Sequence, residues 1–271
     1  MRRIWGSLAV LIMAIMMPAY GAKAQAPASM PADLVEEFVV GNRILFDQGI
    51  IIDGFGHLSV RSPADPTHFY MSRARGAGLV VPDDIIEFDS NSTALNPGDR
   101  RPFSERWIHG EIYRTRPDVM AVVHTHAPSV IPFGVTGVPL RPILHMAGFL
   151  SHEIPVFEIR DVAGDDSNML IQTAPLGAAL AKVLGQGPVV LMRGHGMTVV
   201  GKTIRQAVSR SIYTDVNARA ELEALKLGSH IVFLTEKEGA NIAAVNDASI
   251  NRSWEIWKQK ALQDTPKFDL K

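Results

Sequence analysis

The sequence predicts a single mixed α/β domain whose sheet is at least partly antiparallel. Segments with apolar residues at helical spacing alternate with short segments that have the two-residue period of strands. Three predicted strands, 57–61, 67–72 and 85–88, follow one another with glycine, proline and aspartate between them. This pattern is typical of antiparallel strands rather than of βαβ units. No internal repeat or low-complexity linker interrupts the chain after Pro31, so one domain is expected over 25–271.

The first half of the chain contains two predicted helices. In 32–48 apolar residues recur at 34, 35, 38, 39, 44 and 45, after Pro31 and before Gly49. A turn through 53–56 leads into the three strands already described. The pattern becomes helical again over 104–115, where apolar residues at 107, 108 and 112 share one face before a proline at 117.

The second half begins with an apolar strand that ends at 124–126. A short helix and a Gly/Pro-rich loop are expected over 128–142, then a strand at 154–157 and a helix at 176–184. The apolar strand 188–192 is followed by a second extended segment at 197–200. A long helix over 203–226 has Thr203 at its start and Gly228 at its end, residues that commonly cap helices.

Composition excludes some classes of protein. Hydrophobic residues make up 46% of the 271 residues and charged residues 20%, as in ordinary folded domains. The formal net charge is −1, so nothing favours nucleic acid as a partner. The chain has no cysteine, and any metal must therefore be bound by His, Asp or Glu.

The first 24 residues have the pattern of a cleaved secretory signal peptide. Two arginines precede the short apolar run 8–17, and Ala22-Lys-Ala24 offers a small-x-small cleavage site. The apolar run is shorter than the ~20 residues that a membrane-spanning helix needs. Cleavage after Ala24 and export are expected, to the periplasm if the source is Gram-negative, with no membrane association afterwards.

The active site is expected at the end of the strand that contains His124 and His126. Alternate side chains of a strand share a face, so both imidazoles would point the same way. Two imidazoles at this spacing can hold one metal ion, although an isolated His-x-His also occurs by chance.

A third imidazole comes from His195, which lies between two glycines after the apolar strand 188–192. Glycines let the backbone approach a ligand closely, and a buried imidazole needs a partner. A structural histidine with a satisfied hydrogen bond is the alternative. Three neutral imidazoles with an open position would instead make a catalytic metal site.

Glu105 is the candidate acid or base, at the start of the helix before the His124 strand. A glutamate in a first helical turn can simply stabilise the helix dipole, whereas a carboxyl beside a metal can move a proton. His109 lies four residues on, on the same helix face, either as packing or as support for the site.

These residues, in this order, resemble the class II aldolase/adducin family. The ordered set consists of Ser-Glu, a helix, Val-His-Thr-His and, about seventy residues later, Gly-His-Gly. The resemblance covers residues 33–228. It implies a three-layer α/β/α fold with a central, mainly antiparallel sheet. It also implies that His124, His126 and His195 bind a divalent metal, usually zinc, with Mn²⁺, Co²⁺ or Fe²⁺ as alternatives. Glu105 becomes the catalytic acid/base, and a homotetramer is expected because the family's sugar-phosphate aldolases are tetramers with active sites between subunits.

Two segments depart from the sugar-phosphate aldolases, which usually carry Gly-Asn-x-Ser and Thr-Pro-Ser-Gly around the substrate phosphate. The matching segments here are 56–59, Gly-His-Leu-Ser, and 71–76, Met-Ser-Arg-Ala-Arg-Gly. They are more similar to the family's decarboxylase branch, and Arg pairs readily with carboxylates. Arg73 and Arg75 can also be ordinary solvated charges. The residues expected to contact a small carboxylate substrate are His57, Ser59, Ser72, Arg73 and Ser104.

The resemblance implies a metal-dependent carbon–carbon lyase that decarboxylates a hydroxylated, possibly aromatic, carboxylic acid through a metal-stabilised enolate. Two alternatives stay open: an aldolase or epimerase acting on an unphosphorylated sugar or a hydroxy or keto acid, and a non-catalytic interaction module. Because the family often uses a tyrosine as an acid, Tyr113 and Tyr213 are further candidates, and His145 is a candidate pocket residue.

Overall fold

The computed structural model describes residues 26–95, 97–228 and 230–263 of the chain. The predicted signal peptide, 1–24, lies outside the described residues. The strands are β1 Gly56–Arg61, β2 Phe69–Ser72, β3 Ile85–Phe88, β4 Ala94–Leu95, β5 Ala121–Thr125, β6 Val156–Phe157, β7 Val189–Met192 and β8 Gly196–Gly201. The α-helices are α1 Ala32–Asp47, α2 Arg106–Thr115, α3 Ile131–Thr136, α4 Arg160–Ala163, α5 Ala174–Leu184, α6 Ile204–Leu227 and α7 Glu236–Gln263.

The strands of the described chain form one sheet in the order β4-β3-β2-β1-β5-β8-β7-β6. Every neighbouring pair is antiparallel except β6 and β7, which are parallel. The predicted central, mainly antiparallel sheet is therefore confirmed. The register places His57 of β1 opposite His124 of β5, and Thr198 of β8 opposite His124 on its other side. Three polar residues thus lie side by side across the middle of the sheet.

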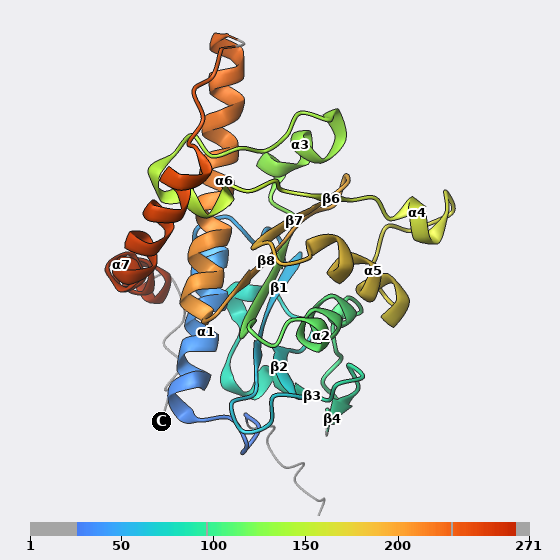
Figure 1. Ribbon diagram of the computed structural model, residues 1–271. Helices are drawn as coiled ribbons and strands as arrows, with labels where there is room; N and C mark the ends of the chain where they lie inside the picture. The colour runs from blue at the N-terminus through green and yellow to red at the C-terminus, as the bar shows by residue number, and fades with distance from the viewer. Residues whose placement is uncertain (1–25, 96, 229, 264–271) are drawn as a thin grey trace, which may run out of the picture.

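Helices cover both faces of the sheet, which gives the expected three layers (Figure 1). On one face, Leu58 and Val123 belong to a buried apolar cluster that includes residues of α1, α6 and α7. On the other face, Val122 belongs to a second buried cluster with residues of α2 and α5. Because side chains alternate along a strand, His124 points to the same side as Val122. The site therefore forms between the sheet and α2.

The predicted element boundaries agree closely with the structure at most positions. Helix α1 begins at Ala32, and β3 covers the expected 85–88. Thr203 caps α6 as expected, since its hydroxyl oxygen accepts a hydrogen bond from the N–H of Gln206 at 3.1 Å. The short strand β4 is not among the expected elements, because Ala94 and Leu95 stand between polar and turn residues and form no apolar or alternating run.

Helix α7 was also missed, although the sequence contained a signal for it. Trp254, Trp257 and Ala261 follow one another at spacings of three and four, which is the apolar pattern of a helix face. All three side chains are buried in the cluster with α1 and α6. In Figure 1, α7 lies on the outer side of this helical layer.

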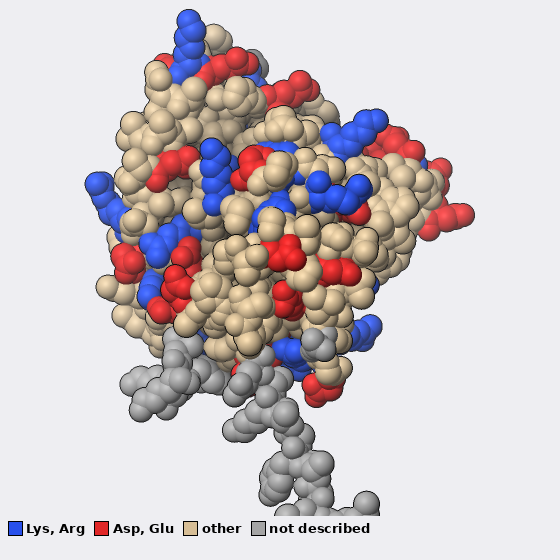
Figure 2. All heavy atoms as spheres, turned by 60° about the horizontal axis from the view of Figure 1, so that its bottom comes forward, with Lys and Arg blue, Asp and Glu red and all other residues tan. Residues whose placement is uncertain are grey.

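None of the helices that the structure describes combines the length and apolarity that crossing a bilayer requires. On the face shown in Figure 2, acidic and basic side chains are interspersed rather than segregated. This face therefore presents mixed charge instead of a continuous patch of one sign.

Candidate metal centre and active site

Four side chains from three separate segments meet at one end of the central strands. His124 and His126 come from the end of β5, His195 from the turn between β7 and β8, and Glu105 from the residue before α2. One ligand atom from each lies within 4.8 Å of the other three. The structure thus brings together the three predicted metal ligands and the predicted acid/base.

The turn that presents His195 depends on its two glycines. Gly194 has φ +64° and Gly196 has φ +148°, which are conformations that other residues rarely adopt. A Cβ atom at Gly196 would also collide with the carbonyl oxygen of Thr125. The N–H of His195 donates to the carbonyl of Met192 at 3.0 Å and closes the turn. The glycines therefore allow the imidazole to approach the end of β5.

Hydrogen bonding defines which nitrogen of His124 can bind a metal. Its Nδ1 lies 3.1 Å from the carbonyl oxygen of Met197, which can only accept, so Nδ1 is the protonated nitrogen. The Nε2 atom therefore carries a lone pair, and it is buried without a hydrogen-bond partner among the described residues. A backbone carbonyl that orients a histidine in this way is usual behind metal ligands. The residues present fit a metal ion, which would occupy this unpaired position.

The carboxyl group of Glu105 faces the imidazoles. One oxygen, Oε1, accepts a hydrogen bond from the N–H of Ile171 at 2.9 Å. The other, Oε2, lies 3.8 Å from Nε2 of His124 and 3.7 Å from Nε2 of His195. Burial raises the pKa of Glu105 to about 7, and the Ile171 bond opposes that rise. The group is therefore balanced between its protonated and ionised forms at neutral pH.

The pKa values of the three imidazoles are shifted in the opposite direction, below the ordinary value of histidine. Burial and the neighbouring His126 lower the pKa of His195 to about 4. Burial also lowers the pKa of His126, and it lowers that of His124 well below the ordinary value. All three rings are therefore neutral at pH 7, which is the form that binds a metal. Three neutral imidazoles and one carboxylate are a suitable ligand set for zinc.

A second polar group lies behind the cluster, between β1 and α2. His57 contacts His109, and Ser59 contacts both His109 and Tyr113, at 2.6–2.7 Å. His57 also lies beside the cluster, with its ring centroid 5.1 Å from that of His124. Ser59, predicted to contact substrate, is buried and directed at His109 and Tyr113 instead. The four-residue spacing from Glu105 to His109 to Tyr113 is the sequence signal for this group.

The other predicted substrate residues lie in different environments. Ser72 is buried, and Ser104 is exposed beside Glu105. Arg73 donates from Nε to Asp84 at 2.6 Å, and Arg75 pairs with the same carboxylate at 3.0 Å. One carboxylate faces two guanidinium groups, so the trio keeps a net positive charge. The Arg73 side chain is still 40% exposed and can contact a further anion.

Two other candidates lie away from the cluster. Tyr213 packs against Trp257, on the face of the sheet opposite α2. Tyr213 and His145 line a cavity of about 250 Å³ between α6, α7 and the short 3₁₀ helix η4, His145–Leu150. No residue of the metal cluster lines this cavity. The fold therefore does not bring Tyr213 or His145 to the cluster within this chain.

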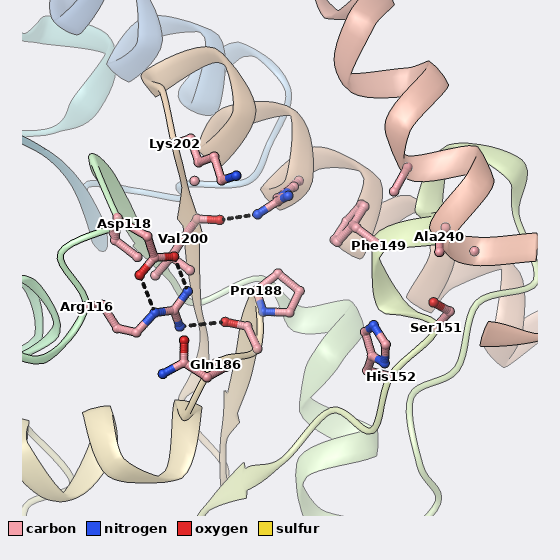
Figure 3. Close-up of a pocket in the computed structure, with 17 residues that line it drawn as sticks. Arg116, Asp118, Phe149, Ser151, His152, Gln186, Pro188, Val200, Lys202 and Ala240 are labelled. Atoms are coloured by element: carbon pink, nitrogen blue, oxygen red, sulfur yellow. Dashed lines mark hydrogen bonds and ion pairs between the residues drawn. The ribbon is translucent and has the colours of Figure 1, made fainter. Parts of the chain in front are cut away.

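A further cavity, of about 260 Å³, lies at the other end of β8 (Figure 3). Its wall includes Arg116, which pairs with Asp118, and Arg210, which donates to the carbonyl of Val200. Lys202 follows β8 on this side. Since His195 precedes β8, this cavity and the histidine cluster lie at opposite ends of the same strand.

Comparison with known proteins identifies the family. The sequence profile of the class II aldolase and adducin N-terminal domain matches residues 36–222. The chain belongs to this family. Decarboxylase tropJ of Talaromyces stipitatus is 38% identical over 253 residues, which cover 85% of this chain and 94% of that protein. The 3,4-dihydroxyphthalate decarboxylase of Arthrobacter keyseri is 29% identical over 218 residues, which cover 76% and 85%.

Solved structures agree with the fold. L-fuculose 1-phosphate aldolase from Glaciozyma antarctica PI12 superimposes with a TM-score of 0.70 at 21% identity, covering 89% of this chain and 94% of that one. This similarity shows that the class II aldolase fold is shared. In this chain the shared fold brings α2, β5 and the β7–β8 turn, which are far apart in the sequence, to one site.

Proposed function

We propose that this chain is a metal-dependent decarboxylase of hydroxylated aromatic carboxylic acids. The cluster of Glu105, His124, His126 and His195 carries the proposal, since its ligand atoms lie within 4.8 Å of one another. The relatives named as decarboxylases support the reaction class, and the 3,4-dihydroxyphthalate enzyme supports the substrate class.

The three histidines would hold the metal, which we propose to be zinc. When bound, the metal would supply a Lewis acid for two neighbouring oxygens of the substrate, such as a phenolic hydroxyl and the adjacent carboxylate. His124 is fixed for this role by its bond to the Met197 carbonyl. Burial keeps the imidazoles neutral and available as ligands.

Ionised Glu105 would take the proton of the substrate's phenolic hydroxyl and would then supply that proton to complete the reaction. When the bond between the ring carbon and the carboxyl group breaks, its electron pair stays on the ring carbon, and a proton must take the place of carbon dioxide. The Oε2 atom of Glu105 faces the cluster while Oε1 is held by Ile171, so the carboxyl is oriented toward the reacting group. His57 and Arg73 would bind the anionic oxygens of the substrate.

The test is a measurement of carbon dioxide release by the zinc-loaded protein from a panel of hydroxylated aromatic acids that includes 3,4-dihydroxyphthalate. Release from at least one acid is expected, together with a loss of about 10²- to 10⁴-fold in turnover for Glu105→Gln. Aldehyde formation from a hydroxy acid, with no carbon dioxide from any aromatic acid, would replace the proposal with an aldolase. Absence of any bound divalent ion after purification with zinc would favour an interaction module.

We also propose export after cleavage at Ala24 and assembly into a homotetramer. The mass of the mature protein purified from its source tests the first proposal, and a mass that still includes residues 1–24 would reject it. Light scattering tests the second. A monomer at micromolar concentration would reject the tetramer.

A further inference from the structure

A continuous chain of hydrogen bonds runs from His57, beside the metal cluster, into the core between β1 and α2. His57 Nδ1 lies 2.7 Å from His109 Nε2, and His109 Nδ1 lies 2.6 Å from the hydroxyl oxygen of Ser59. That oxygen lies 2.7 Å from the hydroxyl of Tyr113. All four side chains are buried. The hydrogen-bond donors of this chain must therefore find their acceptors within the chain itself and not in solvent.

The buried end of the chain sets its direction. Burial raises the pKa of Tyr113, so the phenol keeps its proton. Within the described residues, Ser59 Oγ is the acceptor that the structure offers to the hydroxyl of Tyr113. A buried hydroxyl hydrogen without an acceptor is unfavourable, so Tyr113 donates to Ser59.

The remaining donors follow from this first one. The hydroxyl of Ser59 then donates to Nδ1 of His109, which must be unprotonated. The ring hydrogen of His109 is therefore on Nε2 and is donated to Nδ1 of His57. Consequently the hydrogen of His57 is on Nε2. The opposite direction would leave the hydroxyl hydrogen of Tyr113 buried without an acceptor.

His57 is placed to use this hydrogen at the active site. Its ring lies beside those of His124 and Phe103, at centroid distances of 5.1 and 4.7 Å. The structure records no hydrogen-bond partner for Nε2 of His57 among the described residues, while Nδ1 is occupied by His109. The Nε2 atom of His57 is thus a hydrogen-bond donor, and the hydrogen bond at Nδ1 fixes the direction in which it points.

We propose that His109, Ser59 and Tyr113 are positioning residues that hold His57 as its Nε2–H tautomer, so that it donates a hydrogen bond to an anionic oxygen of the substrate. The oxygen that accepts this hydrogen bond belongs to a substrate carboxylate and not to a phenolate, and a donor at this position disfavours groups that can only donate. The identity of the substrate rests on the proposed function, whereas the tautomer does not. In this arrangement Ser59 acts through two histidines rather than by touching substrate.

The tautomer can be measured directly on the zinc-loaded protein without substrate. Selective ¹⁵N-histidine labelling, with His57 assigned by its absence in His57→Asn, should show a protonated Nε2 and an unprotonated Nδ1. Tyr113→Phe keeps the ring volume but removes the donor that sets the direction, so a mixture of the two tautomers is expected. A native protein with its hydrogen on Nδ1 of His57 would overturn the proposal.

A matched pair of variants tests the effect on binding. His109→Gln keeps an N–H donor for His57, whereas His109→Leu has a similar volume and no donor. By calorimetry, His109→Leu should weaken binding of 3,4-dihydroxyphthalate by roughly tenfold or more, with little change for catechol, which lacks carboxylates. His109→Gln should stay close to the native affinity for both.

These outcomes test the role of His57 independently of the proposed decarboxylation. Equal weakening of both ligands in His109→Leu would overturn the role in recognising a carboxylate, and circular dichroism identifies a variant that fails to fold. In that case Tyr113→Phe supplies the same comparison, with weaker carboxylate binding expected and unchanged binding contradicting the proposal. Failure to release carbon dioxide would reject the decarboxylase alone, because the tautomer of His57 is measured without turnover.

Discussion

Zinc binding is predicted to release a proton from Glu105, in an amount that depends on pH. Its pKa of about 7 means that the carboxyl carries about 0.9 proton at pH 6 and about 0.1 at pH 8. A metal facing Oε2 requires the ionised form, so this proton must leave on binding. The histidines release little, because their pKa values are lowered and their rings are already neutral. Below pH 7 zinc affinity should therefore fall by about tenfold for each pH unit through this group.

Calorimetric titration with zinc in two buffers of different ionisation enthalpy measures the number of protons released. Native protein should release about 0.9 more protons than Glu105→Gln at pH 6, and the two should differ little at pH 8. Glu111→Gln is the matched control on α2, the helix that follows Glu105, since Glu111 pairs with Arg114 away from the cluster. Equal proton release from native protein and Glu105→Gln at pH 6 would refute the assignment.

Three further predictions concern the ligands, the anion contact and the core. His126→Ala should abolish stoichiometric zinc measured by mass spectrometry, and a fully loaded variant would remove this residue from the site. Arg73→Ala should raise KM for carboxylate substrates by roughly tenfold while leaving neutral analogues unchanged, with Arg75→Ala as the control; equal effects on both substrates would reject the contact. Trp254→Ala should lower the free energy of unfolding by about 3–5 kcal/mol in urea titrations because Trp254 is buried under α1 and α6. The exposed Ile256→Ala should change it by about 0.5 kcal/mol or less, and a similar small effect at Trp254 would show that α7 does not dock as described.

Much of the sheet was predictable because its signals are local. The strands around 85–88 and 188–192 are short apolar or alternating runs between turn residues, and each pattern reports which face is buried. The two histidines of His124-Thr-His126 had to share a face for the same reason. The helix α7 was predictable in principle from the spacing of Trp254 and Trp257, whereas β4 lies in no apolar or alternating run.

The roles of individual polar residues depended on tertiary structure. The sequence made Ser59 an expected substrate contact and Tyr213 a further candidate acid, yet Ser59 is bonded to His109 behind the site and Tyr213 packs on the opposite face. For His109, the only signal in the sequence was its four-residue spacing from Glu105. Its partners became defined when α2 packed across β1.

The sequence by itself therefore determined the ligand types and the face of the strand on which they lie. Both properties follow from residue chemistry and the two-residue period of a strand. The tertiary structure decided which imidazole nitrogens carry hydrogens and which carboxyl oxygen faces the cluster. It also decided which hydroxyl makes its hydrogen bonds inside the core. These properties arise from hydrogen bonds between segments that lie far apart in the sequence, such as Ser59 with Tyr113 and Glu105 with Ile171. Such bonds leave no periodic pattern in the sequence, because their geometry exists only once the layers have packed.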